Sequence, residues 1–311
     1  MNTLNSRLAT ALLILAAVFL GGAFASSASA TLPGKNGPLL VNSFTKLGAQ
    51  TPGTVVSTVT EGGRITPIYT RKGLASLPNL SPNGKRIVFQ GQPPANDLFT
   101  GLVAKPGKIQ RITDAPKTFL PSQGIFAADG RSVFYSTTGA VQGGAYRTFI
   151  KRYFFATGKT RAYKVANKQP LVLTDVSPNG RVVALTQSQI LNPRVVTLNL
   201  ATGKLRVVKV GFPTIQASFA PGGKRLAFAG FRGQNWDIFV SNLGGKGVKQ
   251  LTNDKWVDSY PAFSPDGRNV ALTRTDGTVP KGMRVINIQS GKSRELKSPK
   301  RDSFVVQWLP R

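Results

Sequence analysis

FSPDGRNVAL, residues 263–272, is the stretch of this 311-residue chain that decides its fold. Proline presets the backbone on entry to a turn, and glycine accepts the positive φ that tight turns require. A basic residue follows the turn, and apolar residues then occupy alternate positions, which is the pattern of a strand with one buried face. The stretch therefore predicts a hairpin that joins two strands.

The same pattern occurs five times along the chain. The glycines of the five copies are 46, 50, 43 and 44 residues apart, and Asn36-Gly37 lies 47 residues before the first of them and gives a sixth register. An apolar residue precedes each proline position by two, which predicts an inner core strand. These apolar residues are Leu80, Phe126, Val176, Phe219 and Phe263.

Each unit also contains a second turn, for example ATGK at residues 156–159 and at residues 201–204. Four short strands in forty-odd residues are typical of a propeller blade. Residues 308–310 lie 45 residues after residues 263–265 and supply an inner strand with no hairpin behind it. That strand and the strand that begins at Asn36 complete one blade, which removes exposed sheet edges. We therefore predict an all-β, six-bladed β-propeller over residues 31–311, closed by its N- and C-terminal strands.

Residues 1–30 have the pattern of a signal peptide. Arg7 precedes an apolar run at residues 11–24, and the segment ends in Ala28-Ser29-Ala30, which fits a signal peptidase site. The apolar run is shorter than the roughly twenty residues that span a bilayer. We expect cleavage after Ala30 and a mature chain without a transmembrane segment, in the periplasm, outside the cell or on the cell wall. An uncleaved membrane anchor is the alternative.

The turn stretch and two segments before it resemble a known repeat. They are residues 237–240 (DIFV), 250–252 (QLT) and 264–272 (SPDGRNVAL), and they are similar to the WD40-like repeat of TolB-type propellers. The resemblance covers residues 33–311 and implies a six-bladed periplasmic or extracellular binding scaffold. Periplasmic members of the family carry an additional α/β domain before the propeller. Few residues separate the expected cleavage site from Asn36, so we expect that domain to be lacking.

The chain is strongly basic. It has 41 Lys and Arg residues against 12 Asp and Glu residues, for a net charge of +29, and loss of Arg7 with the signal peptide would leave +28. Such a charge attracts polyanions. The expected partners of an exported protein are an anionic envelope polymer, an anionic lipid surface or an envelope protein. No sequence motif for reading nucleic acid is present, and we expect a monomer.

The turn cations are expected on one face of the ring. If strands are named a to d from the channel outward, antiparallel order places the a–b and c–d turns of every blade on the same side. Only Glu61, Asp129 and Asp266 oppose the cations there. The residues could form a cationic binding face, or they could be merely solvated. The a–b turns carry Lys85, Arg131, Arg181, Lys224 and Arg268, and the c–d turns carry Arg64, Lys108, Lys159, Lys204, Lys246 and Lys292.

Residues 130–174 contain no acidic residue and interleave cations with aromatic side chains. Such a pattern can bind single-stranded nucleic acid by phosphate contacts and base stacking. In a propeller, however, strand aromatics usually fill the space between blades, and we favour this interpretation.

Histidine and cysteine are absent, so the familiar catalytic triads and zinc sites cannot be built. We therefore expect no enzyme activity, metal or cofactor. A paired-carboxylate hydrolase needs only two acids, and Asp254 and Asp258 are close in sequence, although a loop-capping role is favoured. Trp236 and Trp256 lie near this pair. The alternative function is therefore a propeller that binds a sugar or peptide on this opposite, mixed-charge face, and a hydrolase or lyase ranks below it.

Overall fold

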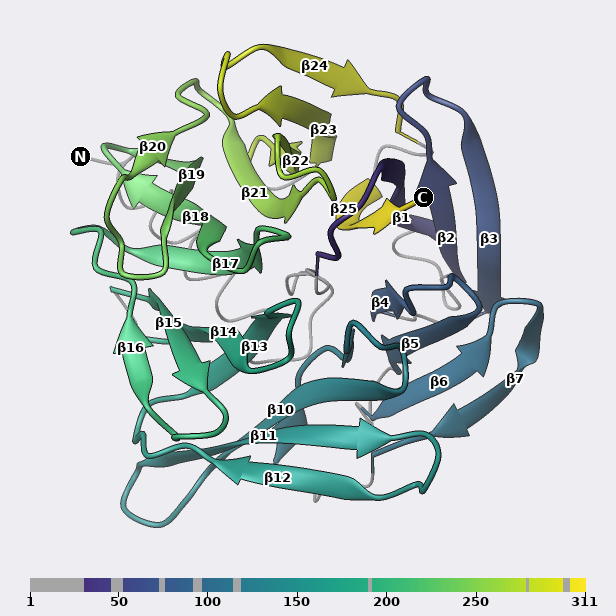
Figure 1. Cartoon of the computed structure of the whole chain (residues 1–311), viewed down its shortest axis with the longest axis vertical. Helices are drawn as coiled ribbons and strands as arrows, with labels where there is room; N and C mark the ends of the chain where they lie inside the picture. Colours follow the sequence, from purple (N-terminus) through teal and green to yellow (C-terminus); the bar gives the residue numbers. More distant parts are fainter. Residues whose placement is uncertain are drawn as a thin grey trace.

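A computed structural model describes residues 31–45, 53–72, 76–91, 97–113, 119–189, 192–277, 280–298 and 303–311. In these ranges the chain forms strands and no helix, arranged as six sheets around a central axis (Figure 1). No helix of a length and hydropathy suited to crossing a membrane occurs in the described ranges. The expected signal peptide, residues 1–30, lies outside them.

Each sheet is one blade, numbered here in chain order and given from the innermost strand outward. Blade 1 contains β25 (Ser303–Pro310), β1 (Asn36–Thr45), β2 (Gly53–Val59) and β3 (Ile65–Lys72); blade 2 contains β4 (Ser76–Leu80), β5 (Arg86–Gln90), β6 (Leu98–Leu102) and β7 (Lys105–Arg111); blade 3 contains β8 (Leu120–Pro121) with β9 (Ile125–Phe126), β10 (Ser132–Ala140), β11 (Tyr146–Phe154) and β12 (Thr160–Lys164). Blade 4 contains β13 (Leu171–Val176), β14 (Val182–Gln187), β15 (Arg194–Asn199) and β16 (Leu205–Val207); blade 5 contains β17 (Thr214–Phe219), β18 (Arg225–Arg232), β19 (Asn235–Asn242) and β20 (Lys249–Gln250); blade 6 contains β21 (Val257–Phe263), β22 (Asn269–Thr275), β23 (Pro280–Asn287) and β24 (Ser293–Leu296). The prediction of a six-bladed propeller is confirmed.

The repeated turns have the geometry that the sequence predicts. The five turn glycines have φ between 65° and 69°, a left-handed conformation that glycine adopts without a Cβ clash. In blade 2 the Ser81 hydroxyl donates to Asn83 Oδ1 (2.8 Å), and the Lys85 N–H also donates to Asn83 Oδ1 (3.1 Å). The Arg86 N–H donates to Ser81 Oγ (2.9 Å). Side chains therefore satisfy the turn backbone, which fixes the positions of the residues that the turn presents.

The apolar positions of the repeat fill the core. All five residues that precede the turns lie in the innermost strands and are at most 1% exposed. The paired positions after the turns, such as Ile87 and Phe89, are also buried and pack against the neighbouring blade. Burial of apolar area between blades is the main stabilising contribution in such a ring.

The ring closes through blade 1, as predicted. Strand β25 pairs antiparallel with β1, with Asn36 opposite Pro310 and Leu39 opposite Trp308. The Trp308 indole N–H donates to the Gly37 carbonyl (3.0 Å). A Cβ at Gly37 would lie 2.7 Å from the Leu309 carbonyl oxygen, so only glycine permits the two chain ends to approach this closely.

Side chains also join each blade to the next near the axis. At each of the six junctions a polar side chain of one blade bonds to a backbone group of the innermost strand of the following blade; we call these bonds the blade joints. They satisfy edge groups that would otherwise lack a strand partner. The joints run from Gln307 to Leu80, Asn79 to Phe126, Gln123 to Thr174, Asp175 to Phe219, Gln216 to Tyr260, and Thr273 to Val305.

Candidate functional site

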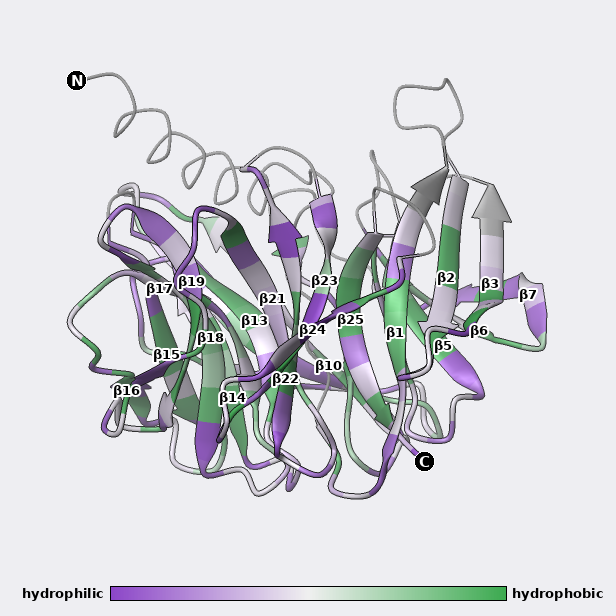
Figure 2. Cartoon of the chain, turned by 90° about the horizontal axis from the view of Figure 1, so that it is seen from above, coloured by the Kyte–Doolittle hydropathy of each residue, from purple (hydrophilic) through white to green (hydrophobic). Residues whose placement is uncertain are grey.

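The a–b and c–d turns of all six blades lie on one side of the ring, which we call the turn face. This follows from the antiparallel order of every sheet. In Figure 2 the turn face is at the bottom, where the carboxyl terminus also lies. We call the opposite side, formed by the b–c and d–a connections, the loop face. Every turn of the turn face lies within the described residues.

All eleven cations predicted for the turn face are exposed. Ten of them lie in turns, as expected from the sequence. Lys108 is the exception, because the c–d turn of blade 2 consists of Val103 and Ala104, and Lys108 lies within β7. Leu102 pairs with Lys105 whereas Gly101 pairs with Ile109, so residues 106–108 bulge out of the ladder near the turn. The expectation that Lys108 belongs to the turn was wrong.

The turn-face cations lack acidic partners. No carboxylate of the described residues lies within 4.0 Å of any of the eleven side-chain nitrogen groups. Two acids of this face pair with other cations: Asp129 with Arg152 (3.5 Å) and Glu61 with Arg294 (4.0 Å). The turn face therefore carries uncompensated positive charge.

The third acid, Asp266, is held by its own turn. It accepts hydrogen bonds from Ser264, from the Arg268 N–H (2.9 Å) and from Asn36 Nδ2 (3.0 Å). Although partial burial opposes the shift, these bonds and the Arg268 charge lower the pKa of Asp266. Its carboxylate stays ionised but is engaged within the turn.

Blade 4 shows that this turn needs no negative charge. The Ser177 hydroxyl donates to Asn179 Oδ1 (2.8 Å), and Asn179 Oδ1 accepts the Arg181 N–H (3.0 Å), which are the bonds that Asp266 makes in blade 6. Asn83 makes the same bonds in blade 2. Asparagine thus preserves the geometry of the turn and removes its charge.

Backbone contacts fix the two sets of cations relative to one another. The Lys85 carbonyl accepts a hydrogen bond from Val103 N–H (2.9 Å), which ties the a–b turn of blade 2 to its c–d turn. Arg131, Arg181 and Arg268 carbonyls do the same in blades 3, 4 and 6. Successive a–b turns also pack together, since Arg225 reaches across to the Gly267 carbonyl (3.1 Å). The backbone of the turns that carry the cations is therefore held in place, and we call this bonded set of turns the rigid base of the turn face.

On the loop face, Arg274 lies between the two candidate acids. Its guanidinium makes two bonds of 2.8 Å with Asp258 and one of 2.7 Å with Asp254 Oδ2. Burial raises the pKa of Asp258, and the ion pair with Arg274 opposes that shift. Asp258 is fully buried, whereas the Asp254 side chain is 43% exposed, and through Arg274 the two acids anchor the d–a connection to β22.

The two tryptophans do not join these acids in a ligand site. Trp236 is 5% exposed and packs in the core between blades 5 and 6, with its ring centroid 5.5 Å from that of Phe231. Trp256 is half-buried, with Lys255 Nζ 5.1 Å from the ring centroid. The expectation that Trp236 contacts a ligand was therefore wrong, because β19 is buried on both of its faces.

Sequence reasoning missed Arg274 and a further acid near this pair, the buried Asp237. The Thr252 hydroxyl donates to Asp237 Oδ1 (3.1 Å) and Gln250 Nε2 donates to Oδ2 (3.1 Å). Burial raises the pKa of Asp237 to about 6, aided by the charges of the two nearby acids and opposed by these bonds. Asp97 and Thr113 repeat the pair in blade 2 (2.8 Å). The DIFV and QLT segments contain this pair, so their recurrence was the available signal.

The basic and aromatic segment of blade 3 is mainly packed. The Arg152 guanidinium lies over the rings of Phe134 (4.9 Å) and Phe154 (4.9 Å), and Phe134 is fully buried. Tyr146 is 37% exposed, whereas the strand aromatics that follow it are buried or half-buried. The structure agrees with core packing as the role of this segment.

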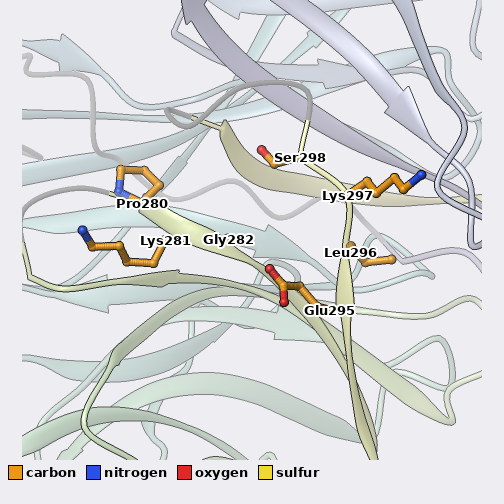
Figure 3. A pocket seen from close by; sticks show the side chains of 7 residues that line it. All are labelled: Pro280, Lys281, Gly282, Glu295, Leu296, Lys297 and Ser298. Atoms are coloured by element: carbon orange, nitrogen blue, oxygen red, sulfur yellow. The ribbon is translucent and has the colours of Figure 1, made fainter.

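A hollow of about 440 Å³ lies beside β23 and β24 (Figure 3). The side chains of Lys281 and Lys297 point in opposite directions there, so the lining groups do not converge on one point. Among the described residues, no three Asp, Glu, His or Cys side chains gather as a metal site would require. The hollow is lined by Pro280, Lys281, Gly282, Glu295, Leu296, Lys297 and Ser298.

Comparison with known proteins supports the assignment of the repeat. Residues 156–310 match the family model of the TolB beta propeller domain. The Tol-Pal system protein TolB of Francisella tularensis subsp. tularensis (strain WY96-3418) is 28% identical over 206 residues, which are 63% of this chain and 44% of that protein. The chain thus spans less than half the length of this curated relative.

Solved structures show the same fold. TolB from Acinetobacter baumannii has a TM-score of 0.69 at 16% identity, over 88% of this chain and 67% of that chain. Oligogalacturonate lyase in complex with manganese has a TM-score of 0.59 at 13% identity, over 85% of each chain. At these identities the likeness concerns architecture alone. The family match over residues 156–310, the repeats and the closed ring of six blades together identify this chain as a TolB-like β-propeller.

Proposed function

We propose that this protein is an exported, non-catalytic binding scaffold that associates through its turn face with an anionic component of the cell envelope. The observation that carries the proposal is the set of exposed turn cations without acidic partners on a rigid base. Export is supported by the signal-peptide pattern of residues 1–30 and by the similarity to proteins named for the Tol-Pal system. An envelope protein with an acidic surface would fit the same face.

Absence of catalysis is part of the proposal. The chain has no histidine or cysteine, and the candidate acids Asp254 and Asp258 are both bonded to Arg274. Nucleophilic and general-base chemistry needs a group that is free to reach a substrate. The loop-face alternative, a sugar or peptide site, loses support because Trp236 is in the core.

Charge reversal on the turn face should strongly weaken binding to anionic vesicles. A variant with Lys85, Arg181, Lys204 and Lys224 changed to Glu is expected to lose more than about a hundredfold in affinity, since each cation near an anionic surface contributes about 1 kcal/mol. Vesicle co-sedimentation at several salt concentrations measures this, and wild-type binding should fall steeply with salt. With no histidine, it should change little between about pH 5.5 and 8.

The matched control reverses four exposed cations of the loop face and has the same net charge. It should lose less than about tenfold, because these residues face away from the bound surface. Equal losses in the two variants would reduce the proposal to a non-specific attraction of the whole molecule. The control residues are Arg147, Lys168, Arg232 and Lys255.

A subtler change should separate charge from structure. The double variant Asn83→Asp, Asn179→Asp keeps every side-chain bond of the two turns, as Asp266 demonstrates, and adds two negative charges. Its unfolding free energy should stay within about 0.5 kcal/mol of wild type, while vesicle affinity falls roughly tenfold. Thermal unfolding measures the stability and co-sedimentation measures the vesicle affinity. An unchanged affinity would count against the turn face as the binding surface.

A further inference from the structure

We propose that the anionic partner of the turn face is a lipid bilayer, on which the ring lies flat with its axis perpendicular to the membrane. The inference rests on the proposed function and names its ligand. It commits to a membrane surface rather than to a linear polyanion or a protein.

The distribution of the cations is the first argument. The a–b turns place one cation in each of blades 2 to 6, close to the axis, and the turns between the two outer strands add a second, wider set. The cations thus cover two dimensions around the whole ring. A linear polymer follows a stripe and would leave most of them unpaired, whereas a plane of anionic head groups can pair with all of them together.

The rigidity of the turn face is the second argument. The a–b and c–d turns are bonded to each other through the backbone carbonyls of Lys85, Arg131, Arg181 and Arg268, so the backbone positions of the cations stay spread over the six blades and do not converge on one compact anion. Lipids move laterally within a leaflet, and their head groups can therefore adjust to a fixed array of charges. A fixed polymer sequence of anions has less freedom to do so.

Apolar side chains on the same face provide the third argument. Leu102 is 40% exposed at the turn end of β6, and Val248 is 39% exposed beside the c–d turn of blade 5. Each lies next to cations of the turn face. Apolar contact combined with basic residues is the composition that favours binding at a membrane interface. In this orientation the loop face points away from the bilayer and remains accessible.

The absence of cysteine allows a direct test of orientation, because one introduced thiol gives a single labelled position. Gly222 is exposed in the a–b turn of blade 5, its φ is not positive, and a Cβ there meets no atom within 4 Å. Asn253 is exposed in the d–a connection on the loop face. The variants Gly222→Cys and Asn253→Cys, each carrying an environment-sensitive fluorophore, therefore report on opposite faces.

The labelled proteins are mixed with phosphatidylcholine vesicles with and without phosphatidylglycerol. We expect the label at position 222 to shift to shorter wavelength only with phosphatidylglycerol, and the label at position 253 to stay unchanged. Replacing Lys224 by Gln in the unlabelled protein should lower the vesicle partition coefficient about fivefold, in line with the loss of one cation. Similar responses at both labelled positions would overturn the flat orientation.

A second experiment measures binding to soluble polyphosphate. It distinguishes the membrane inference from the broader proposal that the turn face binds an anionic component of the envelope. Binding of polyphosphate without binding of the anionic vesicles would overturn the membrane inference and leave the turn face as a polyanion site. If neither binds at low salt, both the inference and the proposed function fail. Vesicle binding with the expected label response supports both.

Discussion

Deletion of residues 304–311 should abolish cooperative unfolding of the propeller. The deletion removes most of β25, and with it the pairing to β1 and the joints made through Val305 and Gln307. It also removes the buried side chains of Val305 and Trp308, which exposes the core residues Leu39 and Val41 of the same cluster, and it opens an unpaired edge on β1. Calorimetry should show a broad transition, or none, in place of a single sharp one.

If the loss of ring closure causes the loss of cooperative unfolding, the missing strand should rescue the deleted protein. A synthetic peptide of residues 303–311 should restore a cooperative transition when it is added in trans, because it supplies the missing strand and both joints. A deleted protein that unfolds with the midpoint and sharpness of the intact chain would show that the ring does not depend on its closing strand.

Replacement of Asp175 by alanine should destabilise the ring by about 4 kcal/mol. This fully buried carboxylate accepts the Phe219 N–H (2.6 Å) across a blade joint and its neighbour Val176 N–H (2.7 Å). Alanine leaves both amides buried without partners, at a cost of about 1–3 kcal/mol each. Denaturant unfolding of the variant measures the loss.

Asparagine at the same position should be tolerated to within about 1 kcal/mol. Asn79 occupies the equivalent place in blade 2 and accepts the Phe126 N–H (3.0 Å) with its amide oxygen. Burial also raises the pKa of Asp175 well above its usual value, opposed by the bonds it accepts. If Asp175→Asn proved as damaging as Asp175→Ala, the negative charge rather than the acceptor would be the essential property.

Stability should decrease as the pH rises from about 4 to about 7. Burial raises the pKa of Asp237 from 3.8 to about 6, so the folded protein holds this proton more tightly than the unfolded chain does. The stabilisation is complete below the unfolded value and is lost as the pH passes through about 6. Asp237→Asn should flatten the dependence near pH 6 in thermal unfolding, and an unaltered slope would contradict this assignment.

The architecture was predictable because the turn residues of each repeat identify it in the sequence. Each glycine register, with an apolar residue before it and two after it, marks a hairpin whose geometry depends on local chemistry. The closing blade followed from the spacing between Phe263 and Trp308. Lys108 was misplaced because Pro106-Gly107 resembles a turn, whereas the chain turns earlier and accommodates these residues in a bulge of β7.

The candidate site was predictable only in part. Exposure of the turn cations follows from topology, since every tight turn must reach the surface. Topology does not predict that the turn cations lack acidic partners. That property arises because Arg152 and Arg294, which come from other strands, pair with Asp129 and Glu61. Trp236 and Arg274 were beyond sequence reasoning for a related reason. Strands β19 and β22 are buried on both faces, so alternation does not tell which residue packs in the core and which forms an ion pair.

The blade joints bear on how such a ring can change over evolution. In each of these six bonds the earlier blade contributes a side chain and the later blade contributes a backbone group, although the Asn79 side chain of blade 2 also donates to Gln307 Oε1 (3.4 Å). The backbone group that takes part in the bond is present whatever the sequence of the later blade, so a duplicated or exchanged blade can still form this bond with its neighbour. Because selection for a closed ring acts at the axis, the turns at the surface are free to accumulate charge and to acquire new partners.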